Sequence, residues 1–131
     1  LKEGLIDGTI DYLTSMHEPY NIDHKKVVFD DASPGTIGLE SLFGLMCNLF
    51  TLEKTIDILT RGKMIFEIDD HPIDVGSKAN LTLFNPDKNY EFSAEHILSS
   101  SNNCAFLGNK LKGVVYGSVN GDKFTLNKLW T

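Results

Sequence analysis

The chain has 131 residues, of which 41% are apolar and 23% are charged, and its formal net charge is -6. This length fits one globular domain, or one small domain plus part of another, and excludes a complete (β/α)8 barrel, which needs about 250 residues. The acidic balance without a basic cluster argues against nucleic acid as a partner, and no stretch approaches the ~18–20 uncharged apolar residues of a membrane span.

The first half of the sequence predicts one strand, a long loop and two helices. Residues 9–15 alternate in polarity after Gly8, which is typical of a strand. The polar loop 16–36 is longer than most connections, and such loops are usually functional or disordered. The apolar spacing over residues 38–50 predicts a buried helix. Thr51 is the expected N-cap of a second helix, which we expect to end at Gly62.

The second half is predicted to be mostly β. Asn85-Pro86-Asp87 reads as a turn, and Ser93 can cap a brief helix through Leu98. Asn120-Gly121 is a strong hairpin signal between two strands. The strands are expected over residues 64–68, 79–84, 90–92, 111–119 and 123–126. Because the character of the sequence changes near residues 61–63, we expect a domain boundary there.

The histidines are the first candidates for metal ligands. His17 is the best of them, because it follows a predicted strand and stands beside Glu18 and near His24. A metal site needs three or four converging ligands, and the sequence contains neither HxH nor HExxH. The alternative is that these are solvated loop residues. For His71 and His96 a structural role is expected, so we predict no metal site in this chain.

Two other features have both a chemical and a structural interpretation. Ser33 to Gly38 places two glycines before a helix, where free amides could hold a carboxylate or phosphate, although a simple turn explains them too. Cys47 and Cys104 are too few for a disulfide scaffold. Cys47 is expected to pack as a small apolar residue, and a reduced, cytoplasmic setting is the simplest interpretation.

Three segments carry a family resemblance, in the right order and across nearly the whole chain. Residues 5–11 with Ser15 to Tyr20 (SMHEPY) are similar to DGxIDxIxxDHAPH. Phe29 to Glu40 (FDDASPGTIGLE) is similar to F-x-x-A-P-x-G-x-x-G-L-E. Val75 to Pro86 (VGSKANLTLFNP) and the following residues 103–119 resemble GxxADLxLFDP and TPFxGxxLxGxV. These are patterns of dihydroorotases in the amidohydrolase superfamily, so the chain resembles the C-terminal third of such an enzyme. Because it also begins at Leu1 rather than Met, we expect it to be cut from a longer protein.

The resemblance implies an α+β chain made of two parts. Residues 1–62 would be the last βα elements of a metal-dependent-hydrolase TIM barrel, and residues 63–131 a small β-sandwich-like domain. Family members interconvert carbamoyl-aspartate and dihydroorotate in pyrimidine biosynthesis, by hydrolysis of a cyclic amide C–N bond. Zinc activates the water, and an Asp after the last barrel strand is the general base.

The sequence departs from the family where catalysis would need it most. Met16 stands at the position of the catalytic Asp, and a thioether cannot take a proton from water. Tyr20 replaces a His that helps to hold substrate, although His17 and Pro19 are retained. The resemblance therefore leaves no catalytic residue, and a vestigial substrate site at Tyr20, Pro34 and Gly35, with His17 as a further candidate. Asn80 also replaces the Asp of the ADL motif.

Three hypotheses follow for function. The chain is part of a dihydroorotase-family hydrolase and is inactive by itself, with no zinc of its own. Alternatively, it comes from a non-catalytic dihydroorotase-like subunit that supports aspartate transcarbamoylase assembly. A stand-alone β-rich binding module is the third, which the in-order match disfavours.

The predicted barrel helix also bears on association. Its apolar residues would be exposed without a barrel, so we expect self-association through it or docking of the helices on the β half. We also expect the loop 16–36 to be poorly ordered. The affected apolar side chains are Leu42, Phe43, Leu45, Met46, Leu49 and Phe50.

Overall fold

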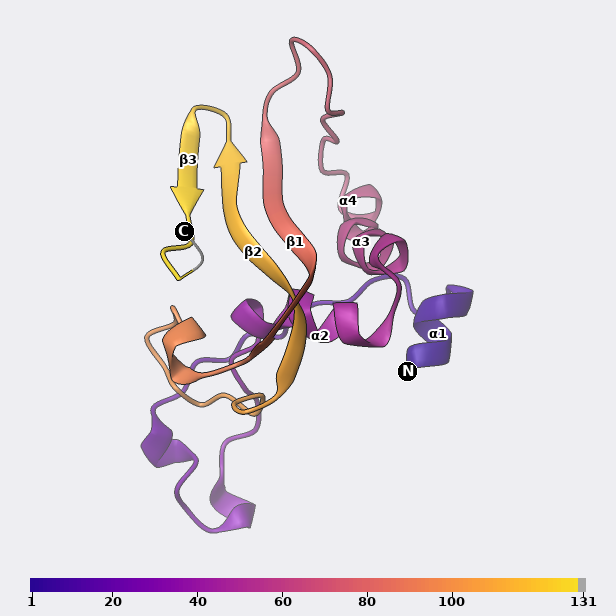
Figure 1. The fold of residues 1–131 in the computed structure, drawn as a ribbon. Coiled ribbons are helices and arrows are strands. Elements are labelled where there is room, and N and C mark those ends of the chain that lie inside the picture. Colours follow the sequence, from indigo (N-terminus) through magenta and orange to yellow (C-terminus); the bar gives the residue numbers. More distant parts are fainter. Residues whose placement is uncertain (130–131) are drawn as a thin grey trace.

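The structure, a computed structural model, describes residues 1–129 and leaves the last two residues of the expected range 63–131 outside. One antiparallel sheet of order β1-β2-β3 stands beside a group of helices (Figure 1). The strands are β1 (Asn80–Glu91), β2 (Lys110–Asn120) and β3 (Lys123–Leu126). The helices are α1 (Lys2–Asp7), α2 (Leu39–Leu49), α3 (Leu52–Thr60) and α4 (Gly62–Ile65), with the 3-10 turns η1 (Ile22–His24), η2 (Phe29–Asp31) and η3 (Ala94–His96). Within this described part, no helix has both the length and the apolarity to cross a membrane.

The two predicted helices of the first half are confirmed as α2 and α3. Gly38 is the N-cap of α2, and the Thr51 hydroxyl accepts a hydrogen bond from the Lys54 amide at 3.3 Å at the start of α3. The expected end at Gly62 is wrong, because that residue begins α4. The strand predicted over residues 64–68 is also wrong, because α4 covers its first residues. The backbone amides of this segment donate to nearby carbonyls, and the Phe66 amide donates to the Gly62 carbonyl at 3.0 Å. They do so because no strand runs beside the segment in the described chain.

The predicted hairpin around Asn120-Gly121 is confirmed, with Asn120 paired to Lys123. The two strands predicted on either side of Asn85-Pro86-Asp87 are one strand, β1, whose register shifts between Asn85 and Asn89. The turn prediction is therefore wrong. Proline has no N–H to donate to a ladder, and a local irregularity accommodates it without ending the strand. The helix predicted after Ser93 is the single 3-10 turn η3.

The predicted strand over residues 9–15 is wrong, and so is the barrel strand that the resemblance placed near residues 5–11. Residues 5–7 belong to α1, which ends at Gly8 in the left-handed conformation (φ 86°). A strand needs a neighbouring backbone to pair with, and here only the isolated bridge His17–Thr36 forms. The sandwich-like second domain also differs, because the described residues contain a single sheet. The coarser expectation of a mixed α and β fold holds.

Helix α2 packs on two sides and joins the halves of the structure. Met46 lies in a buried cluster with Leu5 and Ile58. On the adjoining face of the helix, the Phe43 ring meets the Phe84 ring edge-on at 5.0 Å between centroids. The apolar face of the helix is therefore docked on the β half, one of the two outcomes expected for it, and α2 lies between the sheet and the other helices (Figure 1).

Candidate functional site

The loop that carries the candidate residues begins and ends at the same place. His17 and Thr36 form a parallel bridge, and the Glu18 amide donates to the Thr36 carbonyl at 3.0 Å. Met16 stands just before this bridge with a positive φ of 42°, and it is 66% exposed. The side chain that the sequence resemblance aligns with a catalytic Asp is thus an exposed thioether.

His17 is held as the cap of a helix. Its Nδ1 atom accepts hydrogen bonds from the amides of Gly38 at 3.2 Å and Leu39 at 3.3 Å. Because Nδ1 accepts, the ring proton is assigned to Nε2. The sequence singled out His17 as a metal candidate, and the structure uses one of its two nitrogens to satisfy the N-terminal amides of α2.

Asn103 holds the start of the loop from the other half of the chain. Its Oδ1 accepts from the Tyr20 amide at 3.1 Å, and its Nδ2 donates to the Glu18 carbonyl at 2.9 Å. The Ser101 hydroxyl lies within hydrogen-bond distance of both Asn103 Oδ1, at 2.5 Å, and the Tyr20 carbonyl, and its single proton is available to either acceptor. Asn103 is only 6% exposed. Residues 99–103 are a polar run in the sequence, and no local pattern in it marks Asn103 as this anchor.

The end of the loop is fixed through the same residue. The Ile37 amide and the Thr36 hydroxyl both donate to the Asn103 carbonyl, at 3.2 Å and 3.0 Å. The Thr36 hydroxyl in turn accepts from the Ala105 amide at 2.9 Å. Both ends of the loop are therefore tied to one short buried segment.

The three residues expected to form a vestigial substrate site fall into neighbouring positions rather than one pocket. Gly35 lines a surface depression of about 420 Å3 together with Lys25 and Asn103. Tyr20 lines an adjacent depression with Ser101, and Pro34 is exposed. Gly35 has a φ of 91°, a backbone conformation that favours glycine, and a Cβ atom there would also displace the end of the Glu18 side chain.

The described residues do not fit a metal ion. Across residues 1–129 no three side chains of His, Cys, Asp or Glu come together in a group that could hold one. The loop offers His17, whose Nδ1 is already used, and Met16, whose soft thioether does not suit a zinc-bound water. We therefore derive no catalytic step through a metal in this part of the chain.

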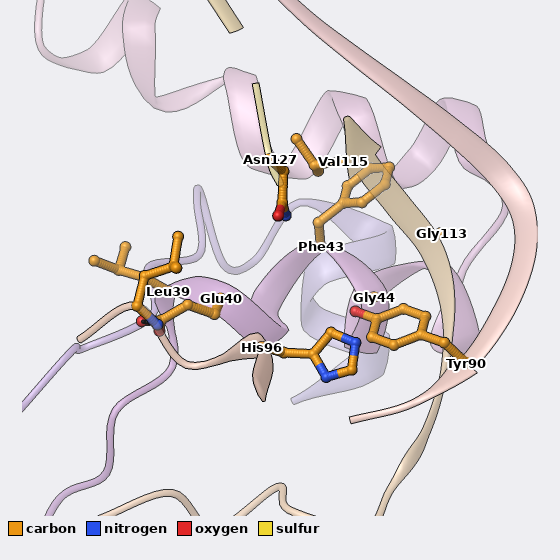
Figure 2. Close-up of a pocket in the computed structure, with 10 residues that line it drawn as sticks. Leu39, Glu40, Phe43, Gly44, Tyr90, His96, Gly113, Val115 and Asn127 are labelled. Carbon is orange, nitrogen blue, oxygen red and sulfur yellow. Dashed lines mark hydrogen bonds between the residues drawn. The ribbon is translucent and has the colours of Figure 1, made fainter. Parts of the chain in front are cut away.

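A second pocket of about 230 Å3 lies between α2 and the sheet. Figure 2 shows the Tyr90 hydroxyl and the edge of the His96 ring facing one another beside Gly44. His96 Nδ1 accepts from the Ser93 amide at 3.0 Å, which closes η3. Glu40 accepts from the amides of Leu98 and Ser99. Each of these polar groups supports local structure, which agrees with the structural role expected for His96.

Burial changes the acidity of two groups near this pocket. Burial raises the pKa of the Tyr90 phenol, with a smaller contribution from Cys47. Burial also raises the pKa of the Cys47 thiol, and the nearby Thr55 and Lys112 act weakly in the opposite direction. A raised thiol pKa disfavours the nucleophilic thiolate, in keeping with Cys47 as a packing residue. Both cysteines are free.

Comparison with known sequences finds dihydroorotases among the relatives of this chain. The sequence is 36% identical over 129 residues to a dihydroorotase of Geotalea daltonii, which covers 92% of this chain and 30% of that protein. It is 35% identical over 133 residues to a dihydroorotase of Chlorobaculum tepidum, covering 96% of this chain and 30% of that protein. The chain thus spans about 30% of the length of the curated relatives it matches. No protein-family model matches the sequence.

Solved structures share the fold. A D-hydantoinase superposes with a TM-score of 0.80 at 19% identity, over 96% of this chain and 30% of that one. The inactive dihydroorotase-like domain of a Chaetomium thermophilum CAD-like multifunctional protein superposes with a TM-score of 0.57 at 21% identity, over 95% and 34%. At these identities the likeness concerns the fold alone.

Proposed function

The chain is related to the dihydroorotases over nearly its whole length, and on this premise we propose that it is the C-terminal portion of a dihydroorotase-family hydrolase. The reaction of the parent class is reversible hydrolysis of a cyclic amide C–N bond, between dihydroorotate and carbamoyl-aspartate in pyrimidine biosynthesis. This portion is inactive by itself. Residues 1–62 correspond to the end of the barrel and residues 63–131 to the small β domain.

Met16 is the observation that carries the proposed inactivity. General-base catalysis needs a group that accepts a proton near neutral pH within hydrogen-bond reach of the water. The Met16 thioether cannot do this, and the described residues contain no metal-binding group that could activate water in its place. Zinc of the family type would have to be held by residues outside this chain.

Tyr20, Pro34 and Gly35 are proposed to be what remains of the substrate site. Tyr20 keeps its backbone anchored through Asn103 and Ser101, and Gly35 keeps the positive φ that its position requires. In this proposal the loop keeps its backbone conformation although its acid–base chemistry is lost. The two free cysteines support a reducing, cytoplasmic location.

The test is an assay of dihydroorotate hydrolysis by the 131-residue chain, with and without added zinc. The Geotalea daltonii relative serves as a positive control under the same conditions. We expect no zinc-dependent turnover from the 131-residue chain. Zinc-dependent hydrolysis by that chain alone would refute the proposal.

A second candidate is that the parent itself is a non-catalytic subunit that supports aspartate transcarbamoylase assembly. The paired changes at Met16 and Tyr20 favour it, because both positions of the family's DHxPH motif that handle substrate or proton are altered. Stoichiometric bound zinc and turnover in the full-length parent would favour the enzyme instead. Absence of turnover, together with a stable complex in sedimentation with aspartate transcarbamoylase, would support the subunit.

Self-association through α2 remains part of this proposal. Most of the apolar face of α2 is covered within the chain, but Leu39 and Leu49 are more than half exposed. Replacing both with Gln removes apolar surface without touching the packed side of the helix. Light scattering should show a mass above that of a monomer for the parent chain and a lower mass for the double variant. A monomeric parent chain would contradict the proposal.

A further inference from the structure

The Lys25 side chain folds back onto its own loop. Its ammonium group donates to the carbonyl of Ser33 and, at 2.5 Å, to the carbonyl of Gly35. The same ammonium lies 5.4 Å from the centroid of the Tyr20 ring. One cation thus contacts Tyr20 near the start of the loop and both Ser33 and Gly35 near its end.

These three contacts have the chemistry of an ammonium site. Backbone carbonyls accept hydrogen bonds from N–H groups, and the face of a tyrosine ring attracts a cation within about 6 Å. Lys25 and Gly35 also line the depression next to Asn103. The Lys25 side chain, which carries the ammonium group, therefore lines this surface depression.

A backbone hydrogen bond also joins the two sides of the loop close to Lys25. The Ser33 amide donates to the His24 carbonyl at 3.1 Å, directly beside the Lys25 contacts. By contrast, the base of the loop is held through Asn103 and Thr36, as in the Tyr20 amide bond to Asn103 Oδ1. The part of the loop around His24 and Ser33 is thus held by other groups than the base of the loop, which Asn103 and Thr36 hold.

We propose that the loop contains a binding site for a primary ammonium, made by the Ser33 and Gly35 carbonyls and the Tyr20 ring, and that Lys25 fills it as an internal latch. The latch holds residues 20–35 in one closed conformation. It also keeps the Gly35 carbonyl from serving as an acceptor for any outside ligand. This inference does not depend on the proposed function, because it concerns the conformation of the loop.

Amide hydrogen exchange measured by NMR on the full chain tests the latch. In Lys25→Ala, exchange of the Ser33 amide should become about tenfold faster, the size expected when charged hydrogen bonds are lost. The Tyr20 amide at the loop base should keep its rate, which also shows that the variant folds. Lys26→Ala is the matched control, since Lys26 is an exposed lysine next in the chain. Equal Ser33 rates in the Lys25→Ala and Lys26→Ala variants would overturn the latch.

Chemical rescue tests the ammonium site itself. n-Propylammonium supplies the atoms that Lys25→Ala lacks, and it should slow Ser33 exchange back toward the parent rate in a saturable manner. Tetramethylammonium has the same charge but no N–H to donate, so it should not restore protection. If the two cations act alike, or if neither acts, the site does not recognise a primary ammonium and the proposal fails.

Discussion

The Nδ1 atom of His17 accepts a hydrogen bond from the Gly38 amide at 3.2 Å, so a loop residue caps a helix whose N-cap lies 21 residues later. The first amides of a helix have no partner within it, and Gly38 and Leu39 would otherwise lack one at this end. Gly38 itself has no side chain to act as a cap. His17 therefore couples the position of the loop to the start of α2.

The first prediction concerns this cap. His17→Ala should lower the free energy of unfolding by about 1 kcal/mol, the usual value of a lost N-cap. His17→Asn should retain most of that free energy, because an Asn oxygen can occupy the place of Nδ1. Urea denaturation followed by circular dichroism measures both. His17→Gln is the control, since its oxygen falls nearer the place of Nε2, and stability equal to that of the Asn variant would contradict the capping role.

Asn103 is the second target, because it joins both ends of the loop to the rest of the chain. Asn103→Ala should lower the free energy of unfolding by about 2 kcal/mol, since it leaves the Tyr20 amide and the Glu18 carbonyl without their partner. Asn102→Ala removes a neighbouring exposed amide side chain and should cost much less. The comparison is made by urea denaturation. Similar losses in the two variants would show that the anchor is not energetically significant.

Gly113 gives a third prediction, on the contact between α2 and β2. A Cβ atom there would lie 2.9 Å from Phe43 Cε1 and 3.1 Å from Cys47 Sγ, and the residue has a φ of 98°. Gly113→Ala should therefore destabilise the fold by about 3 kcal/mol, from backbone strain and overpacking together. Gly76→Ala isolates the strain, because Gly76 has a φ of 87° with open space around it. If the two variants lose equal stability, the packing argument is wrong.

The parts of the fold that sequence patterns predicted are those that depend on local interactions. Helix α2 follows from an apolar period within residues 39–50, and the hairpin follows from Asn120-Gly121. The strands predicted at residues 9–15 and 64–68 failed because a strand needs a partner, and the described chain provides none. Alternation in a sequence indicates which face is apolar but does not supply the neighbour.

The site was predicted only in part, for a related reason. The family resemblance singled out His17, Tyr20 and Gly35, which do lie around one loop. It gave no reason to consider Asn103, whose partners Tyr20 and Glu18 are 83 and 85 positions away. A buried Asn inside a polar run resembles linker residues until the long-range contacts are known. The use of His17 as a cap was hidden in the same way.

The raised pKa of Tyr90 gives a prediction for alkaline pH. Burial favours the neutral phenol in the folded state, so this contribution to stability is complete below the unfolded pKa of about 10 and is lost as the pH rises through the higher folded pKa. The free energy of unfolding should therefore fall above about pH 10, and less steeply in Tyr90→Phe. Denaturation series at several pH values measure the slopes. Parallel slopes for the two proteins would contradict the assignment.

Met16 provides the last prediction, because its backbone conformation favours other residue types. A positive φ of 42° is costly for Met, whereas Asn and Asp adopt this region more readily. Since Met16 is 66% exposed, little apolar burial is lost on substitution. Met16→Asn should raise the free energy of unfolding by about 0.5 kcal/mol, measured by urea denaturation. Met64→Asn, at an exposed methionine in α4, should give no such gain. A loss of stability in Met16→Asn would show that the thioether makes a contribution that outweighs the backbone strain.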